Sequence, residues 1–331
     1  MSSTGRVVVV TGAGGFIGSH LVEGLVAEGS RVRALVHYNA EGSIGCLRHI
    51  DRRTLDAIEI VASDVRDPYA MRSLVRGAQT VFHLAALIGI PYSYVAPASY
   101  VETNIGGTLN LLEATRAEGV ERLVVTSTSE TYGTAQYTPI DEVHPAVAQS
   151  PYAATKVGAD QLALSYHRSF DTPVSVVRPF NTFGPRQSER AIIPTIVVQA
   201  LRNTEPLRLG SLEPRRDLLY VTDTVRGFLA LAESPEAIGR AVNLGTGNAH
   251  SVRELVEAVG RVLGRELRVV QDTARVRPER SEVMELRADA SVARSLGWIP
   301  NVSLEDGLRH AVDFIRRVPP DLSATSKGYR V

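Results

Sequence analysis

Short runs of consecutive apolar residues alternate with longer amphipathic segments through the first 180 residues of the chain. An uninterrupted run is typical of a strand that is buried on both faces of a parallel sheet. The longer segments repeat apolar residues at helical spacing. Because the two kinds of segment alternate, we predict an α/β fold with a doubly wound parallel sheet and right-handed crossovers. The predicted strands are 6–10, 31–36, 58–61, 80–84, 122–126 and 174–177, and the predicted helices are 16–27, 100–118 and 151–170.

The pattern changes after residue 178, where prolines and charged loops interrupt the alternation. Proline removes a backbone donor and interrupts regular elements. We therefore predict two interleaved parts. The large domain covers residues 5–178 and includes further segments near 218–247, and a smaller lobe covers 179–217 and 248–320. The segments expected to return to the large sheet are a strand at 218–221 with a helix at 223–232, and a strand at 241–244.

Composition narrows the possible partners of the protein. The 331 residues carry 36 basic and 36 acidic side chains, so the net charge is zero and indicates no general affinity for nucleic acid or for an anionic membrane. The single cysteine, Cys46, leaves no disulfide framework, and we expect no metal site. The first residues do not resemble a signal peptide and no stretch reaches 18 apolar residues, so we expect a cytoplasmic protein.

A glycine-rich turn follows the first predicted strand directly. Gly12 permits the tight turn, Gly15 lets the backbone approach a pyrophosphate, and Gly18 lets the following helix pack closely on the strand. The helix N-terminus adds amides and a positive dipole end. This strand–turn–helix context predicts a Rossmann-type domain that binds a dinucleotide.

The second predicted strand lacks the acidic residue that usually binds the NAD ribose about 20 residues after the first glycine. His37 or Asn39 could bond the ribose hydroxyl, whereas His37 with Arg33 could accept a 2′-phosphate. We favour NAD and leave NADP open. Further along, Asp64 and Val65 are placed to hold the adenine. The residues that follow the 80–84 strand and should line the cofactor are Leu84, Ala85 and Ala86.

Tyr152 and Lys156 stand four residues apart, on one face of a predicted helix. A phenol has a pKa near 10. A neighbouring ammonium, together with a positive nicotinamide, lowers that pKa toward the working pH. The tyrosinate can then take a proton from a sugar hydroxyl while hydride leaves the same carbon. The spacing therefore predicts alcohol oxidation, with Lys156 also holding the nicotinamide ribose.

These features together resemble the extended short-chain dehydrogenases/reductases that act on nucleotide sugars, the NAD-dependent epimerase/dehydratase family. The resemblance covers nearly the whole chain and includes 83–86, 104–110, 127–133, 178–186, 216–223 and 243–247 beside the glycine loop and the Tyr/Lys pair. It implies a nucleotide-diphosphate sugar as substrate and a homodimer formed through helices near 100–118 and 151–170. It also adds Phe16, Ile17, Asn104 and Thr126 to the cofactor-binding residues.

In this family, the residues that precede Tyr132 and Gly133 distinguish the reactions. The 4-epimerases tend to carry small residues where this chain has Ser129 and Glu130, whereas 4,6-dehydratases carry an acid at the position of Glu130. The GDP-mannose type has Ser before that acid, as here, and the dTDP-glucose type has Asp. The resemblance implies that Thr128 bonds the C4 oxygen and that Glu130 removes the C5 proton before water leaves C6.

The LegB-type N-acetylhexosamine nucleotide 4,6-dehydratases of legionaminic-acid-type pathways are the nearest in resemblance. The stretches 86–94, 130–137 and 186–194 carry this similarity, and Thr131 departs from it where Val or Leu is frequent. We expect a UDP- or GDP-linked hexose or N-acetylhexosamine as substrate. The residues expected to contact it are Tyr92, Asn181, Arg186, Arg216, Arg277 and Arg280, where the arginines match phosphate oxygens bidentately.

Three alternatives stay open at this point. UDP-glucuronate decarboxylases also carry the Thr–Ser–Glu triplet and begin with the same C4 oxidation, although they need a cation that faces a C6 carboxylate. A nucleotide-sugar 4-epimerase is disfavoured by Glu130. A catalytically silent dinucleotide-sensing protein is disfavoured because Thr128, Tyr152 and Lys156 are all present.

Overall fold

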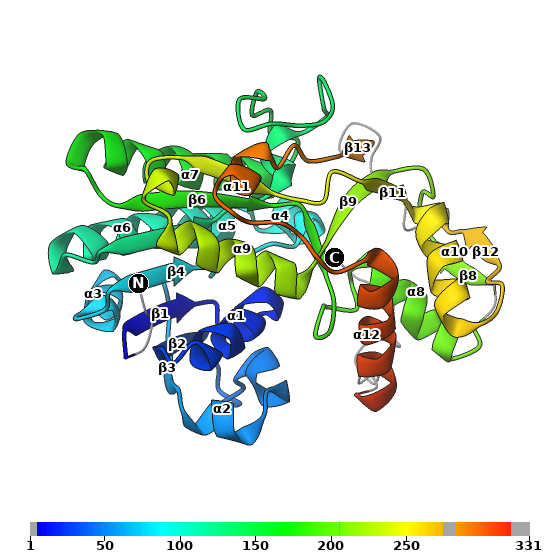
Figure 1. Cartoon of the computed structure of the whole chain (residues 1–331), viewed down its shortest axis with the longest axis horizontal. Helices are drawn as coiled ribbons and strands as arrows, with labels where there is room; N and C mark the ends of the chain where they lie inside the picture. Colours follow the sequence, from blue (N-terminus) through cyan, green and yellow to red (C-terminus); the bar gives the residue numbers. More distant parts are fainter. Residues whose placement is uncertain (1–4, 205, 274–282, 319–331) are drawn as a thin grey trace.

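A computed structural model describes residues 5–204, 206–273 and 283–318 (Figure 1). Its central feature is a seven-stranded sheet in the order β10-β6-β5-β4-β1-β2-β3. All six neighbouring pairs are parallel, which confirms the predicted fold class. The strands are β1 (Val7–Thr11), β2 (Arg31–His37), β3 (Glu59–Ser63), β4 (Thr80–His83), β5 (Arg122–Thr126), β6 (Val174–Pro179) and β10 (Ala241–Leu244).

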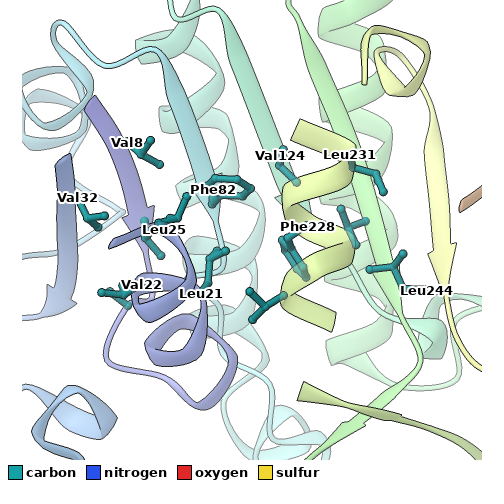
Figure 2. Close-up of a cluster of buried hydrophobic side chains, with 14 of the residues drawn as sticks. Val8, Leu21, Val22, Leu25, Val32, Phe82, Val124, Phe228, Leu231 and Leu244 are labelled. Atoms are coloured by element: carbon teal, nitrogen blue, oxygen red, sulfur yellow. The ribbon is translucent and has the colours of Figure 1, made fainter. Parts of the chain in front are cut away.

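Helices cover both faces of this sheet because successive strand residues point to opposite sides. Val8 of β1 faces a cluster with α1 (Phe16–Ala27) and α9 (Val221–Glu233), as Figure 2 shows, and Val10 belongs to the same cluster. Val9 faces the opposite cluster, which includes residues of three other helices. These are α3 (Pro68–Val75), α6 (Gly107–Glu118) and α7 (Pro151–Phe170).

The segment predicted as one helix over 100–118 consists of three pieces. It begins earlier, at α5 (Pro97–Tyr100), continues through a π-helical turn at Val101–Gly106, and becomes α6 at Gly107. The short helix α4 (Ile90–Val95) precedes it. Apolar periodicity does not report such a change of winding. Single π turns of this kind often occur at functional sites.

A second sheet contains β9 (Arg215–Tyr220) between β11 (Ala249–Ser251) and β13 (Glu285–Leu286), and β7 (Asn181–Phe183) also pairs with β9. The strand predicted at 218–221 was expected in the large sheet, and this prediction was wrong. Leu219 packs into the core of the large sheet, whereas Leu218 and Tyr220 pack into a different core. A strand that is buried between two cores has the same apolar pattern as one inside a single parallel sheet.

The chain does return to the large domain after β9. Helix α9 follows immediately and packs beside α1, and β10 forms the edge strand next to β6, as expected for 241–244. The start points of two later helices are explained by capping side chains. Ser251 and Glu254 form a capping box at the start of α10 (Val252–Leu263), and Ser303 caps α12 (Leu304–Arg317).

The other elements complete the part of the molecule that surrounds the second sheet. A third apolar cluster joins α10 and α12 to α8 (Ile192–Leu201), with strands β8 (Leu207–Leu209) and β12 (Val269–Gln271) paired beside them. Among the described residues, no helix is both long enough and apolar enough to cross a bilayer. The remaining short elements are the 3₁₀ turns Gly45–His49, Ser129–Tyr132 and Pro235–Ala237 and the helices α2 (Arg52–Asp56) and α11 (Ser291–Ser295).

Candidate active site

The glycine loop connects β1 to α1 at the carboxyl edge of the large sheet, where ligands of open α/β sheets bind. Gly12 has a φ of +69°, and a Cβ there would lie 2.7 Å from the backbone nitrogen of Ala85. A Cβ on Gly18 would overlap the carbonyl of Gly12. No side chain caps α1, whose N-cap is Gly15. The loop therefore offers helix-end amides and close backbone access, which fits the pyrophosphate of a dinucleotide.

A series of buried hydrogen bonds holds the glycine loop in place. The Thr11 hydroxyl accepts the amide of Ala85 (3.2 Å) and lies 2.8 Å from Nδ1 of His83, while Nε2 of His83 lies 3.1 Å from Thr108. Because Thr108 donates its proton to the carbonyl of Asn104, the His83 ring donates from Nε2 and accepts at Nδ1. Burial, together with the smaller effect of the Lys156 charge, lowers the pKa of His83 to about 3, so the ring is neutral.

The Asn104 side chain holds the loop after β4. Its oxygen accepts the amide of Leu87 (2.8 Å), and its nitrogen donates to the Leu87 carbonyl (3.0 Å) and to Thr155 (3.0 Å). Each of its polar atoms is thus engaged by protein. The side chain of Asn104, a predicted cofactor residue, therefore holds the backbone of residues 84–87 beside the glycine loop.

Some of the residues predicted to bind the adenosine part of the dinucleotide are already hydrogen-bonded to other groups of the protein. Asn39 bonds the His37 carbonyl and both backbone groups of Ser43, so its amide holds its own loop. Arg66 binds the Asp64 carboxylate at 2.6 Å, and this hydrogen bond is the main reason that the pKa of Asp64 is lowered. His37 is exposed, with Nδ1 3.9 Å from Asp64. Of the two side chains proposed for the ribose hydroxyl, only that of His37 is unoccupied by its own loop.

Tyr152 and Lys156 lie on the first turns of α7, facing the end of β5. Both are buried, at 7% and 4% exposure, and the Lys156 ammonium donates to the carbonyl of Thr126 at 2.5 Å. Burial lowers the pKa of Lys156 to about 8. The hydroxyl of Thr126 is buried without a hydrogen-bond partner among the described residues. A polar group of a bound cofactor would satisfy it, in agreement with its predicted role.

The phenol of Tyr152 is hydrogen-bonded to Thr128, which lowers its pKa. Burial outweighs this effect and raises the pKa of Tyr152 above its usual value, and the charges of Glu130 and Asp160 add to the increase. We predicted a lowered pKa at this residue. In the protein alone burial dominates, so ionisation of the phenol depends on additional positive charge.

The triplet Thr128–Glu130 begins a 3₁₀ turn at Ser129–Tyr132. The Thr128 hydroxyl caps this turn by accepting the amide of Glu130 at 3.2 Å. Ser129 is buried inside the turn, whereas Glu130 is half-buried. The turn therefore joins Thr128, which is hydrogen-bonded to the Tyr152 phenol, to Glu130, whose charge acts on the same phenol.

A series of tilted and edge-to-face aromatic contacts connects Tyr152 to the predicted substrate-binding residue Tyr92. Tyr92 of α4 packs against Tyr100 at 6.2 Å between ring centroids, and Tyr100 packs against Tyr152 at 6.4 Å. Tyr92 is 42% exposed, so one side of its ring can contact a ligand. Asn181 begins β7, next to the end of β6, and is half-buried.

Arg186, which was predicted to bind the diphosphate, lies in the loop after β7 and faces α1. Its guanidinium makes a bidentate ion pair with Glu23 of α1, at 2.6 and 2.9 Å, and also donates to Ser19 at 3.3 Å. Its side chain is 9% exposed. Arg186 therefore joins the loop after β7 to α1, and a diphosphate would have to displace Glu23 from it.

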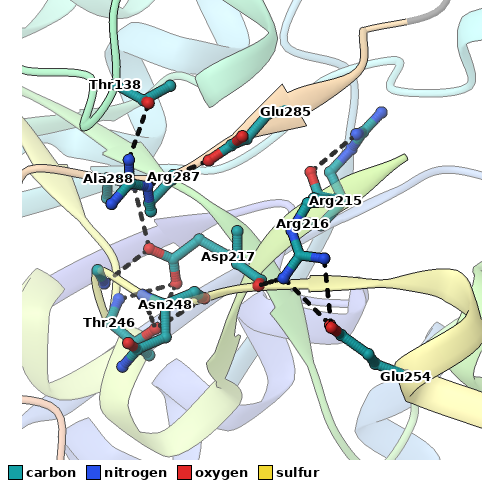
Figure 3. A network of polar contacts seen from close by, with 12 residues as sticks. Thr138, Arg215, Arg216, Asp217, Thr246, Asn248, Glu254, Glu285, Arg287 and Ala288 are labelled. Atoms are coloured by element: carbon teal, nitrogen blue, oxygen red, sulfur yellow. Dashed lines mark hydrogen bonds and ion pairs between the residues drawn. The ribbon is translucent and has the colours of Figure 1, made fainter. Parts of the chain in front are cut away.

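Arg216 lies on β9, where its Nη1 donates to the carbonyl of Arg215 at 3.0 Å (Figure 3). Its neighbour Arg215 binds Glu254 and the carbonyl of Ala249. The guanidinium groups of these two successive arginines therefore bind different partners. Arg277 and Arg280, the other two predicted clamps, lie outside the described residues.

Asp217 follows Arg216 on β9, and its carboxylate is buried. It accepts the amides of Thr246 (2.9 Å), Gly247 (2.8 Å) and Ala288 (3.1 Å), as well as the hydroxyl of Thr246 (Figure 3). These bonds tie the loop after β10 and the segment after β13 to β9. The position of Arg216 in the second sheet depends on this junction.

Sequence reasoning missed Asp160, which stands one helical turn beyond Lys156 and is fully buried. The i, i+4 spacing that identified the Tyr/Lys pair also indicates this neighbour. Within the described ranges, no group of three or more His, Cys, Asp or Glu side chains is arranged to hold a metal ion.

Comparisons with known proteins identify the family. A family model described as GDP-mannose 4,6 dehydratase matches residues 9–311. A dTDP-glucose 4,6-dehydratase of Actinoplanes sp. is 33% identical over 315 residues, which cover 93% of this chain and 97% of the relative. UDP-glucuronic acid decarboxylase 4 of Arabidopsis thaliana is 31% identical over 340 residues, covering 97% of this chain and 72% of the relative.

A solved structure of a similar fold contains bound ligands. It is UDP-glucuronic acid 4-epimerase of Bacillus cereus, in complex with UDP-glucuronic acid and NAD. It superposes with a TM-score of 0.85 at 27% identity, covering 95% of this chain and 100% of that one. The match of the family model over most of the chain shows that the protein belongs to the GDP-mannose 4,6 dehydratase family, within the extended short-chain dehydrogenases/reductases.

Proposed function

We propose that the protein is a nucleotide-sugar 4,6-dehydratase with NAD as its cofactor. The observation that carries this proposal is the position of Glu130, whose negative charge acts on the Tyr152 phenol from the turn that begins at Thr128. An oxidation at C4 requires Tyr152 and Lys156. An acid beside them can remove a second proton, at the neighbouring carbon, which a 4-epimerase does not need to do.

The glycine loop would hold the pyrophosphate of the dinucleotide, and Thr126 and Lys156 would hold its nicotinamide end. When bound, NAD accepts a hydride from the sugar and later returns it. Lys156 would hold the ribose hydroxyls, and His37 would bond the adenosine ribose. The B. cereus epimerase is a complex with NAD, which supports NAD as the cofactor here.

In the first half of the reaction, the Tyr152 phenolate takes the proton of the C4 hydroxyl as that carbon becomes a ketone. The Thr128 hydroxyl, which is hydrogen-bonded to the phenol, orients the C4 oxygen. Lys156 keeps positive charge beside the phenolate below a pH of about 8, where its amine is protonated. These three residues perform a proton transfer that every activity in this family shares.

In the second half, the Glu130 carboxylate takes the C5 proton, which the C4 ketone has made acidic. The electron pair moves into a C5–C6 double bond, the C6–O bond breaks, and the departing hydroxide leaves as water with the proton from Glu130. The returned hydride adds at C6 and a proton adds at C5. The net change is loss of one water, and the cofactor is regenerated.

The test is mass spectrometry of the protein incubated with UDP-, GDP- and dTDP-linked hexoses and N-acetylhexosamines and with UDP-glucuronate. We expect loss of one water from a hexose or N-acetylhexosamine, with the active nucleotide identified by the panel. Loss of carbon dioxide from UDP-glucuronate alone would replace this proposal with a decarboxylase. An isomer at C4 without any mass change would indicate an epimerase, and binding without reaction would indicate a sensor.

Glu130→Gln separates the two halves of the reaction because it keeps the volume of the side chain and removes its basicity. We expect loss of water elimination by about 10²–10⁴-fold, with cofactor binding and the unfolding midpoint unchanged. Glu121→Gln is the matched control, since it makes the same exchange at an exposed carboxylate that precedes β5, at the opposite end of that strand from Thr126. Elimination at the wild-type rate in Glu130→Gln would remove Glu130 from the mechanism.

We also propose a homodimer through the outer faces of the helices between 97 and 118 and of α7. Three exposed apolar side chains support this, namely Val101, Leu109 and Phe170, at 50%, 38% and 50% exposure. Light scattering of the purified protein should give twice the chain mass of 35.8 kDa. Leu109→Glu should shift the mass to that of the monomer. A monomeric wild-type protein would contradict the proposal.

A further inference from the structure

Asp160 is a buried carboxylate that the reaction described above does not use. Its Oδ2 accepts the hydroxyl of Ser127 at 2.8 Å and Nε of Arg178 at 3.0 Å. Its Oδ1 is buried and has no hydrogen-bond partner among the described residues. Asp160 and Arg178 are 1% and 6% exposed, so their ion pair is almost completely removed from water. Such a pair is costly to bury, and its presence at this position needs an explanation.

Arg178 connects this carboxylate to the turn that carries the catalytic triplet. Its Nη1 donates to the Tyr132 hydroxyl at 3.0 Å, and its guanidinium lies over the Tyr132 ring at 5.0 Å from the centroid. The Tyr132 hydroxyl in turn donates to Asn243 at 2.7 Å. Tyr132 is the last residue of the turn Ser129–Tyr132. Polar contacts therefore run without interruption from Asp160 to the turn that holds Glu130.

Asp160 also acts on the other side, toward the Tyr/Lys pair. Its charge raises the pKa of Lys156 against the effect of burial, and it raises the pKa of Tyr152. One carboxylate thus balances two buried cations, Lys156 and Arg178. The charged groups that act on Asp160 itself are Arg178 of β6 and Lys156 of α7. Glu130 of the turn and Tyr100 of α5 also act on Tyr152, neutral His83 of β4 interacts with Lys156, and Glu142 acts on Tyr132.

We propose that Asp160 is a positioning residue of the active site: its carboxylate is the shared counter-charge of Lys156 and Arg178, and through them it sets the pH range of the alcohol oxidation and the place of the Glu130 turn. The proposal rests on the proposed function only in that Tyr152 takes the proton of an alcohol. It assigns the buried ion pair to the working pH of the enzyme rather than to stability alone.

Asp160→Asn is the decisive variant because the amide has nearly the same shape and its oxygen can still accept from Ser127 and Arg178. Loss of a negative charge lowers the pKa of both neighbouring groups. The Tyr152 phenol then ionises at lower pH, and Lys156 loses its proton at lower pH. Both limbs of the pH–rate profile should therefore move in the same direction, by about one pH unit or more.

The readout is single-turnover reduction of bound NAD by the active nucleotide sugar, measured by absorbance across a pH series. Ser127→Ala is the matched control, since it removes a bond to the same oxygen and leaves the charge. It should keep the wild-type profile. Asp160→Glu, which restores the charge, should return the limbs toward their wild-type positions even if its rate is lower. A lower rate in Asp160→Asn with both limbs in place would overturn the proposal.

If Asp160→Asn alone does not fold, the double variant Asp160→Asn/Arg178→Met removes the anion together with its paired cation. Exchange of a buried pair for less polar groups is often tolerated. Lys156 still lacks its counter-charge there, so the same displacement is expected, and an unmoved profile would again refute the proposal. Failure of the dehydratase proposal would appear in the product, not in this half-reaction, which dehydratase, epimerase and decarboxylase share.

Discussion

Asp160 in the large domain and Asp217 in the second sheet are both buried aspartates, yet their surroundings differ. Asp217 accepts three backbone amides and one hydroxyl, and all four donors are neutral. Asp160 faces two cations and keeps one oxygen without a hydrogen bond among the described residues. Burial is the first reason that the pKa of each carboxyl is raised. The partners, rather than the burial, therefore distinguish a structural carboxylate from one that serves the reaction.

The difference extends to the regions around the two residues. Asp217 joins loops from distant parts of the chain, so its neighbourhood depends on backbone hydrogen bonds. The carboxyl edge of the large sheet instead gathers titratable side chains, with Tyr152, Lys156 and His83 all buried. Substitutions in the first region should mainly alter stability, and substitutions in the second should mainly alter rates and pH dependence.

The largest effect is expected from Tyr152→Phe, which removes only the hydroxyl that takes the C4 proton. Reduction of bound NAD by substrate should decrease by about 10²–10⁴-fold. Cofactor affinity and the unfolding midpoint should stay close to wild type, because the ring still packs against Tyr100. The measurement is single-turnover absorbance with NAD titration on the same samples. Retained reduction would show that another group takes the proton.

Asp217→Ala should have the largest effect on stability. It leaves the amides of Thr246, Gly247 and Ala288 without their acceptor, and each unsatisfied buried group costs about 1–3 kcal/mol. We expect the free energy of unfolding to decrease by roughly 3 kcal/mol or more, measured by urea denaturation. Asp217→Asn keeps one acceptor oxygen and should lose less. Equal losses in the two variants would mean that these hydrogen bonds do not stabilise the junction.

A smaller and gradual effect is expected from His83. Its pKa is 6.5 when unfolded and about 3 in the folded protein, so only the unfolded chain takes up a proton between these values. The stability that neutral His83 provides is complete above pH 6.5 and decreases as the pH falls toward 3. The expected slope is about 1.4 kcal/mol per pH unit.

Urea unfolding at several pH values measures this slope, and His83→Gln provides the comparison. Gln offers a hydrogen-bonding amide to the same pocket and does not titrate. The unfolding free energy of this variant should therefore change less with pH than that of the wild type, and the two slopes should differ by about 1.4 kcal/mol per pH unit. Identical slopes in the two proteins would contradict a neutral, buried His83.

Much of the large domain could be predicted because its signals are local. The bounds of α1, β5 and α7 follow from uninterrupted apolar runs, from Pro151 at a helix start and from glycines at a turn. The sheet that contains β9 could not be predicted in this way. Its burial arises from two cores that the chain assembles from distant segments, and apolar pattern does not report which core is contacted.

The candidate site shows the same limit at the level of single residues. Tyr152 and Lys156 were found from their spacing within one helix, and Asp160 could have been found by the same rule. The pairing of Arg186 with Glu23 joins residues 163 positions apart, and nothing local indicates it. An arginine in a phosphate-binding motif and one in a structural ion pair have the same side chain. Only the fold determines which partner is within reach.

The return of the chain to the large sheet after β9 has a consequence for synthesis on the ribosome. Helix α9 and strand β10 complete one face and one edge of that sheet, but they follow some 40 residues of the other lobe. A nascent chain that has reached only β6 therefore exposes an open strand edge, and it lacks the Phe228 side chain that covers Phe82. The large sheet cannot be completed before residue 244 has emerged, and by then residues 180–220 of the other lobe have already been synthesised.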